Sequence, residues 1–503
     1  MSRLRSAWDS IVAWPHLPRL IEAMLLALIL ADFARVVARL IGVDATLHWD
    51  ESVYAVRARS WVDPDAPLSG WSHIRPPLLP LVATIPVLAG GDEWQLRSLG
   101  LIGAIGLLLA SWWLARLLAG PVAGVAAVAV LATGPSLLRE SGVMLTDVPS
   151  AAMLVVVVAL LWRELELRER PGPGLVLAAA IAVAAFFMRY GSLVALAPVI
   201  AMSVIFWWRR LASAPRLTIV AVAIGVAAAV GHVSWSLLQT GSPLGVLLDA
   251  QAVVPPDISG DPPLDEYLRY VDFLLVGEVG QLAILASLAA VPLAVLISIV
   301  DARWRRPARG LALVMVTALA HVALLTRGVG HAEERYFVFS AALLVVAGVS
   351  IAALLVRLLP MPARVALIVA GAVLVVANRG PGVEWSFDSY GRAGRADLPY
   401  ELAGLAIAEA SGPDCGIITG GDPIVAWYSR CETERLRLPP QGGSVADALM
   451  AEEKWLVLYG GYDIDLDASP VREAMADVSR SPLRITDPVT GDVVAWAWRF
   501  ADR

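Results

Sequence analysis

Long apolar runs repeat along this chain, and they constrain its fold more than any other feature. A transmembrane helix needs about 20 consecutive, mostly apolar residues. Of the 503 residues, 58% are hydrophobic and only 17% are charged, whereas soluble domains have about 25% charged residues. We therefore predict a mainly α, polytopic transmembrane helix bundle. About eleven spans are expected, at 20–42, 95–118, 121–138, 146–162, 174–188, 190–208, 217–238, 279–299, 310–326, 335–357 and 363–378.

Arginine recurs in every second connection between these runs. Short cytoplasmic loops carry an excess of Lys and Arg, so this alternation predicts a sidedness. With the N-terminus in the cytoplasm, the Arg-rich segments all fall on the cytoplasmic side. They lie within 3–19, at 116, and within 163–170, 209–216, 303–309 and 357–364. The pattern predicts a multi-pass protein of a cell membrane.

This sidedness places three regions outside the cytoplasm: the loops 43–94 and 239–278, and the tail from 379. The apolar segment 76–90 contains several prolines and is short for a span, so we expect it to lie in the outer interface. The tail has alternating apolar runs, "CGIITGG", "KWLVLYGG" and "DVVAWAWRF", which are typical of strands. We predict a transmembrane domain over 1–378 and a small extracytoplasmic α/β domain over 379–503.

The only two cysteines, Cys415 and Cys431, both fall in that tail. An even pair of cysteines outside the cytoplasm favours a disulfide. The alternative is a pair of unbonded, buried thiols.

Charge and motifs exclude several function classes. The formal net charge is -6, which implies no broad basic surface for nucleic acid. The sequence contains neither a G-x-x-x-x-G-K-[ST] phosphate loop nor a dinucleotide-binding fingerprint, so nucleotide hydrolysis and Rossmann-type cofactors are not expected.

Acidic residues stand at the predicted outer ends of two spans. "LHWDESVY" (47–54) contains Asp50 and Glu51, and "LTDVPS" (145–150) contains Asp147. Each motif could simply cap a helix. Together they suggest two carboxylates flanking a water-accessible pocket. One would take a proton from an acceptor hydroxyl, and the other would orient that acceptor or hold a metal.

Arginines stand on the same predicted side. Arg75 lies in "HIRPPLLP" (73–80), Arg189 in "FMRYGS" (187–192), and Arg335 with Tyr336 in "HAEERYFVF" (331–339). Guanidinium groups match phosphate oxygens, so these residues are candidates for a phosphate pocket. The alternative is that each arginine reaches toward lipid headgroups or pairs with an acid.

Three histidines, His48, His73 and His331, fall near these motifs. With Asp50 or Asp147 they could bind a divalent metal, although no ligand spacing is diagnostic.

The order of these motifs resembles a known family. It runs from "HWDESVYAVRARSW" through "RPPLLP", "LTDVPS", "MRYGS" and "GSPLG" to "ERYFVFSAALLVVAG". It looks like the polytopic C-type-fold glycosyltransferases, in the branch of protein O-mannosyltransferases and lipid A aminoarabinose transferases. The similarity covers about 20–350. The tail resembles the outside domains of prokaryotic members, including "WYSRC" (427–431) as a strand end, which favours a prokaryotic plasma membrane.

The resemblance implies a hexosyl or pentosyl transferase. It would move a sugar from a polyprenyl-phosphate carrier to a protein, lipid or glycan acceptor of the cell envelope, with inversion. It implies Asp50 with Glu51, together with Asp147, as the catalytic carboxylates. It implies donor-binding roles for Arg57, Arg75, Arg189, Arg335 and Tyr336. Some relatives carry an acid where this chain has Ile74, which weakens the case for a metal.

Three other readings remain open. A transporter or flippase of a lipid-linked sugar would also have a polar cavity, but it predicts inverted repeats and charges at mid-membrane. An oligosaccharide transferase of the same fold predicts a longer outside domain. A membrane scaffold leaves the paired acids unexplained. The sequence does not identify the sugar or the acceptor.

Overall fold

The computed structural model describes residues 16–43, 45–67, 75–252, 277–328, 334–411, 415–435, 455–459 and 482–499. These residues form two compact units. We call them the bundle unit, from the described parts of Met1–Leu40, Gly100–Gly142 and Thr146–Phe387, and the mixed unit, from those of Ile41–Leu99, Val143–Leu145 and Asp388–Arg503.

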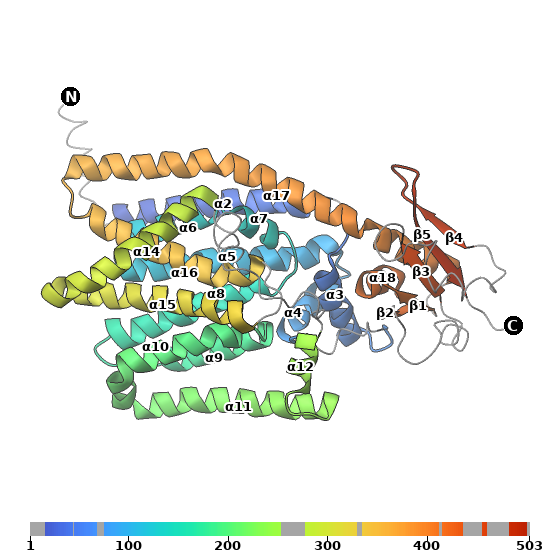
Figure 1. Ribbon diagram of the computed structural model, residues 1–503, viewed down its shortest axis with the longest axis horizontal. Helices are drawn as coiled ribbons and strands as arrows, with labels where there is room; N and C mark the ends of the chain where they lie inside the picture. Colours follow the sequence, from blue (N-terminus) through green and yellow to red (C-terminus); the bar gives the residue numbers. More distant parts are fainter. Residues whose placement is uncertain are drawn as a thin grey trace. The chain divides into compact units, whose positions relative to one another are not determined.

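The bundle unit is built of long apolar helices, drawn in Figure 1. Within it α8 packs against α9, and α16 packs against α8, α14 and α15. Its helices are α2 (Leu17–Ile41), α5 (Glu93–Ala119), α6 (Pro121–Leu131), α7 (Pro135–Ser141), α8 (Asp147–Trp162), α9 (Gly174–Met188), α10 (Ser192–Ser213), α11 (Pro215–Thr240), α12 (Gly245–Ala252), α14 (Gly277–Val300), α15 (Arg305–Gly328), α16 (Val338–Val356) and most of α17 (Met361–Ser411). Shorter turns of other helical types occur at Arg163–Leu167, Ala302–Trp304 and Glu334–Phe337.

Eight helices of the described chain are long and apolar enough to cross a membrane, or up to nine if one bent pair counts as a span. They match eight of the predicted runs and confirm the helix-bundle class. The other three runs also form helices. However, α2 carries five charged residues, α6 and α7 are bent by 76°, and α9 has only 15 residues. The count of eleven spans and their sidedness stay predictions.

The mixed unit joins helices to a five-stranded sheet. Its helices are α3 (Trp49–Val62), α4 (Leu78–Leu88) and α18 (Asp422–Ser429), and its strands are β1 (Gly416–Thr419), β2 (Glu432–Arg435), β3 (Trp455–Tyr459), β4 (Leu483–Thr486) and β5 (Val493–Arg499). The strand order is β2-β1-β3-β5-β4, with β2, β1 and β3 parallel and the other pairs antiparallel. The eleven residues of α4 extend about 16 Å, too short for a span.

The core of the mixed unit lies where the last turns of α17 meet the sheet. Ala403 and Ile407 of α17 are fully buried against apolar residues of β1, β3, β4, β5 and α18. The three predicted strands are confirmed as β1, β3 and β5. The prediction of a strand end at "WYSRC" is wrong, because Trp427–Ser429 close helix α18 and a strand begins only at Glu432. A proline in its first turn suits this helix start, since proline lacks the N–H that a first turn leaves unbonded.

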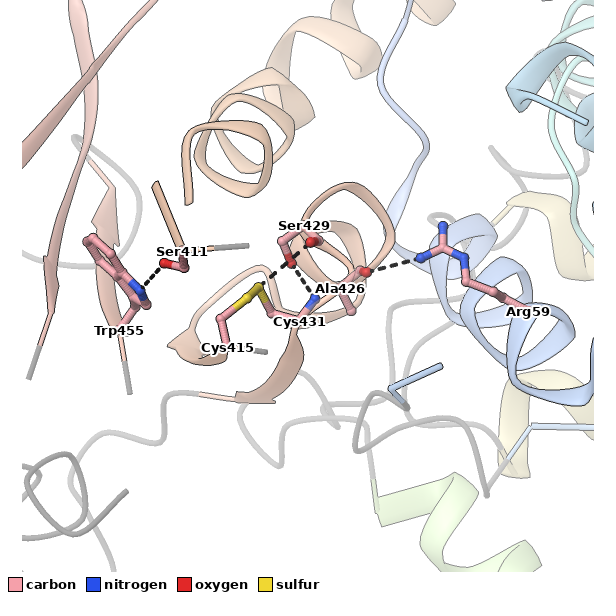
Figure 2. Close-up of a disulfide and its surroundings, with 7 residues drawn as sticks. All are labelled: Arg59, Ser411, Cys415, Ala426, Ser429, Cys431 and Trp455. Carbon is pink, nitrogen blue, oxygen red and sulfur yellow. Dashed lines mark hydrogen bonds between the residues drawn. A yellow bond between two sulfur atoms is a disulfide. The ribbon is translucent and has the colours of Figure 1, made fainter. Parts of the chain in front are cut away.

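Cys415 and Cys431 form a disulfide between the approaches to β1 and β2, as Figure 2 shows. The two residues are 16 apart in the sequence. Closing a loop of this length stabilises a fold by about 3 kcal/mol, largely by restricting the unfolded chain.

Reduction of this disulfide is therefore expected to lower the free energy of unfolding of the full chain in detergent by about 3 kcal/mol. The measurement is chemical unfolding with and without dithiothreitol, followed by the rate of proteolysis in the C-terminal residues. The double variant Cys415→Ser, Cys431→Ser is the control. It should match the reduced native protein and should not respond to the reductant. Equal stability of oxidised and reduced protein would contradict the prediction.

Candidate active site

Glu51 lies in the mixed unit, fully buried in the first turn of α3. Its Oε1 accepts hydrogen bonds from the Met144 backbone N–H at 2.7 Å and from Arg97 Nε at 3.2 Å. Its Oε2 accepts from the His48 backbone N–H at 2.9 Å and from Arg97 at 3.2 Å. These four bonds occupy both carboxylate oxygens. The geometry favours a positioning role for Glu51 over the predicted catalytic role.

Arg97, on α5, is the main partner of Glu51 and was not among the predicted site residues. Its side chain is 3% exposed. Beyond Glu51, it donates to the backbone carbonyls of Ala45 and Thr46, both at 2.8 Å. Its guanidinium carbon also lies 5.5 Å from the centroid of the Tyr390 ring. One feature of the sequence could have identified Arg97. It lies near the predicted outer end of an apolar run, where the positive-inside rule disfavours arginine.

Asp50, the neighbouring acid, is placed differently. Its Oδ1 forms an ion pair with Arg75 at 2.5 Å, and the Asp50 and Arg75 side chains are 14% and 23% exposed. Arg57, two turns further along α3, donates to the Arg75 backbone carbonyl. The Arg57 guanidinium carbon lies 5.1 Å from the ring centroid of Trp61. Helix α3 therefore carries both Asp50 and Arg57, and Arg57 fixes the backbone of Arg75, the partner of Asp50.

The bundle unit contains a second acid–arginine pair. Asp147, the first residue of α8, forms an ion pair with Arg189. Arg189 follows the last residue of α9 in an extended conformation, as the predicted interruption between two apolar runs requires. Its guanidinium carbon lies 4.2 Å from the ring centroid of Tyr336, and that of Arg335 lies 5.7 Å from the same ring. Four predicted site residues therefore meet within this unit.

Arg75 and Arg189 thus each pair with an acid, which was the alternative to phosphate binding predicted for these arginines. An arginine paired with a carboxylate is still suited to phosphate, because its planar fork is already oriented and can exchange one oxyanion for another. A carboxylate near a guanidinium is also a site where a proton can be accepted next to a positive charge that binds a leaving group.

The predicted metal ligands are only partly described. His48 precedes α3, whereas His73 and His331 lie outside the described residues. Among the residues that the structure covers, no group of three or more His, Cys, Asp or Glu side chains could hold a metal ion.

Comparisons with known proteins give the fold. No protein-family model and no curated protein sequence matches the chain. Among solved structures, ArnT from Cupriavidus metallidurans bound to undecaprenyl phosphate is similar with a TM-score of 0.63 and 14% identity. The match covers 96% of this chain and 98% of that one.

An archaeal protein is also similar over most of this chain. The oligosaccharyltransferase AglB from Archaeoglobus fulgidus, in complex with an inhibitory peptide and a dolichol-phosphate, has a TM-score of 0.52 and 12% identity. That match covers 90% of this chain and 70% of AglB. At these identities the likeness concerns the fold alone. The chain therefore has the polytopic fold of the C-type membrane glycosyltransferases, as its motif order predicted.

Proposed function

We propose that this chain is an integral-membrane glycosyltransferase. It moves a sugar from a polyprenyl-phosphate carrier to a protein, lipid or glycan acceptor on the outer face of the membrane. The observation that carries the proposal is the pairing of Asp50 with Arg75 and of Asp147 with Arg189. Support also comes from the fold, shared with ArnT and AglB, whose structures hold undecaprenyl phosphate and dolichol-phosphate.

The reaction exchanges one oxygen for another at the anomeric carbon of the sugar. The acceptor hydroxyl gives its proton to the Asp50 carboxylate, and its oxygen forms a bond to the anomeric carbon. The bond from that carbon to the carrier phosphate breaks, and the phosphate leaves with the electron pair. Attack from the face opposite the leaving group inverts the anomeric centre. Asp147 is the second carboxylate that the motif order implies for this reaction.

The arginines act on the leaving group. Negative charge grows on the carrier phosphate as the bond breaks, so a fixed guanidinium stabilises the transition state more than the bound donor. Arg75 and Arg189 first hold the two carboxylates. When the donor phosphate takes over a guanidinium, the carboxylate is released to accept a proton. The phosphate of the correct donor thus activates the base that uses it.

Replacing Arg189 by Gln is the first test of this function. We expect the transfer rate from a polyprenyl-phosphate sugar to fall by about 10²–10³-fold, because one preorganised donor to the developing charge is lost. The assay is sugar release from radiolabelled polyprenyl-phosphate mannose and glucose in membranes, with nucleotide sugars as comparison donors.

Arg35→Gln is the matched control, because Arg35 forms an ion pair of the same type with Asp32 at 2.7 Å on α2. Its rate should equal that of the native protein. Equal rates for native and Arg189→Gln protein would remove Arg189 from the site. Turnover of nucleotide sugars alone would contradict the proposed donor class.

A further inference from the structure

The segment that leads into α3 has no regular backbone partners of its own. Residues 45–48 are irregular, yet Ala45, Thr46 and Leu47 are buried. Buried backbone groups need hydrogen bonds. The carbonyls of Ala45 and Thr46 accept from Arg97, whereas the Leu47 N–H donates to the hydroxyl of Tyr428 on α18 at 3.1 Å. One of these partners thus comes from a residue 381 positions later.

The Tyr428 hydroxyl both accepts and donates a hydrogen bond. It accepts from Leu47 and donates to Glu93 Oε1 at 2.5 Å. Burial, followed by the nearby charges of Glu93 and Glu401, raises the pKa of this hydroxyl, so it keeps its proton and remains a donor. A second contact supports the same segment, because the Thr46 hydroxyl donates to Glu401 Oε2 at 2.6 Å. The N-terminal entry of α3 is therefore held by the C-terminal residues.

The other end of α3 is held by the same helix. The Arg59 guanidinium donates to the carbonyl of Trp427 at 2.9 Å and to that of Ala426 at 3.5 Å, and its carbon lies 3.9 Å from the centroid of the Trp427 ring. These carbonyls belong to the last turn of α18, where a cation is favoured, and that of Ala426 also accepts from the Arg430 backbone N–H at 3.2 Å. Burial lowers the pKa of Arg59 to about 10, which leaves it charged at neutral pH.

Helix α18 is itself anchored where it ends. The Cys431 N–H donates to the Ser429 hydroxyl at 3.0 Å, and Cys431 is bonded to Cys415 just before β1. Figure 2 shows these contacts between the disulfide and Arg59. Helix α18 is thus bonded to the sheet through the disulfide, and it contacts both ends of α3, the helix that carries Asp50.

From these contacts we infer that α18 is a clamp on α3, and that Tyr428 and Arg59 are positioning residues for Asp50. The C-terminal part of the chain then contributes to the site, because its contacts set the orientation of α3. The inference about Asp50 rests on the proposed function, whereas the clamp itself does not. The experiment separates the two.

The test uses the full chain in detergent and the variant Tyr428→Phe, which removes only the shared hydroxyl. Amide hydrogen exchange is measured over 45–62. We expect exchange there to become about two- to tenfold faster, in line with the loss of one hydrogen bond. Exchange in α16 should stay unchanged. Arg59→Gln should produce the same effect toward the other end of α3.

Tyr459→Phe is the matched control. Tyr459 is a buried tyrosine of β3 in the same unit, but its hydroxyl bonds to that of Thr419 on β1 at 2.8 Å, within the sheet. This variant should leave exchange over 45–62 at the native level. Unchanged exchange in Tyr428→Phe, or an equal increase in Tyr459→Phe, would overturn the clamp.

Turnover then tests the positioning role. Tyr428→Phe should lower kcat by about 10- to 100-fold, because a displaced base loses alignment. KM for the donor should stay near the native value. Faster exchange with native kcat would overturn the role of α18 in positioning Asp50. If the native chain transfers sugar from no donor, the proposed function fails, and hydrogen exchange still decides on the clamp.

Discussion

Replacing Asp50 by Asn is expected to lower the rate of sugar transfer by about 10²–10⁴-fold, the usual contribution of a general base. Asn has nearly the same shape and can still accept a hydrogen bond from Arg75, so the fold should be preserved. It cannot take the proton of the acceptor hydroxyl. Binding of the donor should persist, because Arg75 and Arg189 are retained.

The measurement is single-turnover transfer from the preferred polyprenyl-phosphate sugar, together with donor binding at equilibrium. Asp32→Asn is the matched control, since Asp32 forms ion pairs with Arg35 and Arg379. Its rate should equal the native rate. Native turnover in Asp50→Asn would exclude Asp50 as the base. Loss of donor binding along with turnover would instead indicate a structural role for Asp50.

Replacing Glu51 by Ala is expected to have the largest effect on stability. Glu51 is fully buried, and the Arg97 side chain is 3% exposed. Removing one partner of a buried ion pair destabilises a protein by about 3–5 kcal/mol, because the other charge remains buried without compensation. The backbone N–H groups of Met144 and His48 would lose their acceptor as well.

Thermal and chemical unfolding of the full chain in detergent would measure this loss. The double variant Glu51→Leu, Arg97→Met should recover only the part that comes from the uncompensated charge. The backbone N–H groups of Met144 and His48 still lose their acceptor, and the carbonyls of Ala45 and Thr46 lose their donor. Asp388→Ala is the control for an exposed pair, with Arg392, and should cost no more than about 1 kcal/mol. A loss below about 1 kcal/mol in Glu51→Ala would show that Arg97 finds another partner.

The sequence predicted the helix bundle because membrane spans are encoded locally. A run of apolar residues forms a helix in lipid whatever its neighbours are, since every backbone group must be bonded within the segment. The same locality explains why β1, β3 and β5 were recognised. The Gly-Pro-Gly at 380–382 favours a break, yet α17 continues through it to Ser411. There Ser386 donates to the carbonyls of Gly382 and Pro135, a tertiary contact that local rules do not contain.

The site was only partly predictable for a related reason. Asp50, Asp147 and Arg189 were predicted as site residues because charges at the ends of apolar runs are costly. Their pairing was not found, since 42 residues separate Asp147 from Arg189. The difference between Asp50 and Glu51 was also hidden, because adjacent residues of a helix point in different directions. Only the three-dimensional structure shows that the Glu51 carboxylate accepts four hydrogen bonds.

The contact between Leu47 and Tyr428 also affects when the protein can assemble. Tyr428 lies 381 positions after Leu47, and synthesis of this length requires about 20–75 s at about 5–20 residues per second. Until then α3 of the nascent chain lacks its contacts with α18. A chain that terminates before α18 never forms these contacts. The entropy of closing so long a loop grows only slowly with its length, so the delay is set by translation. The contacts between α3 and α18 therefore form only after the chain has been synthesised to the end of α18.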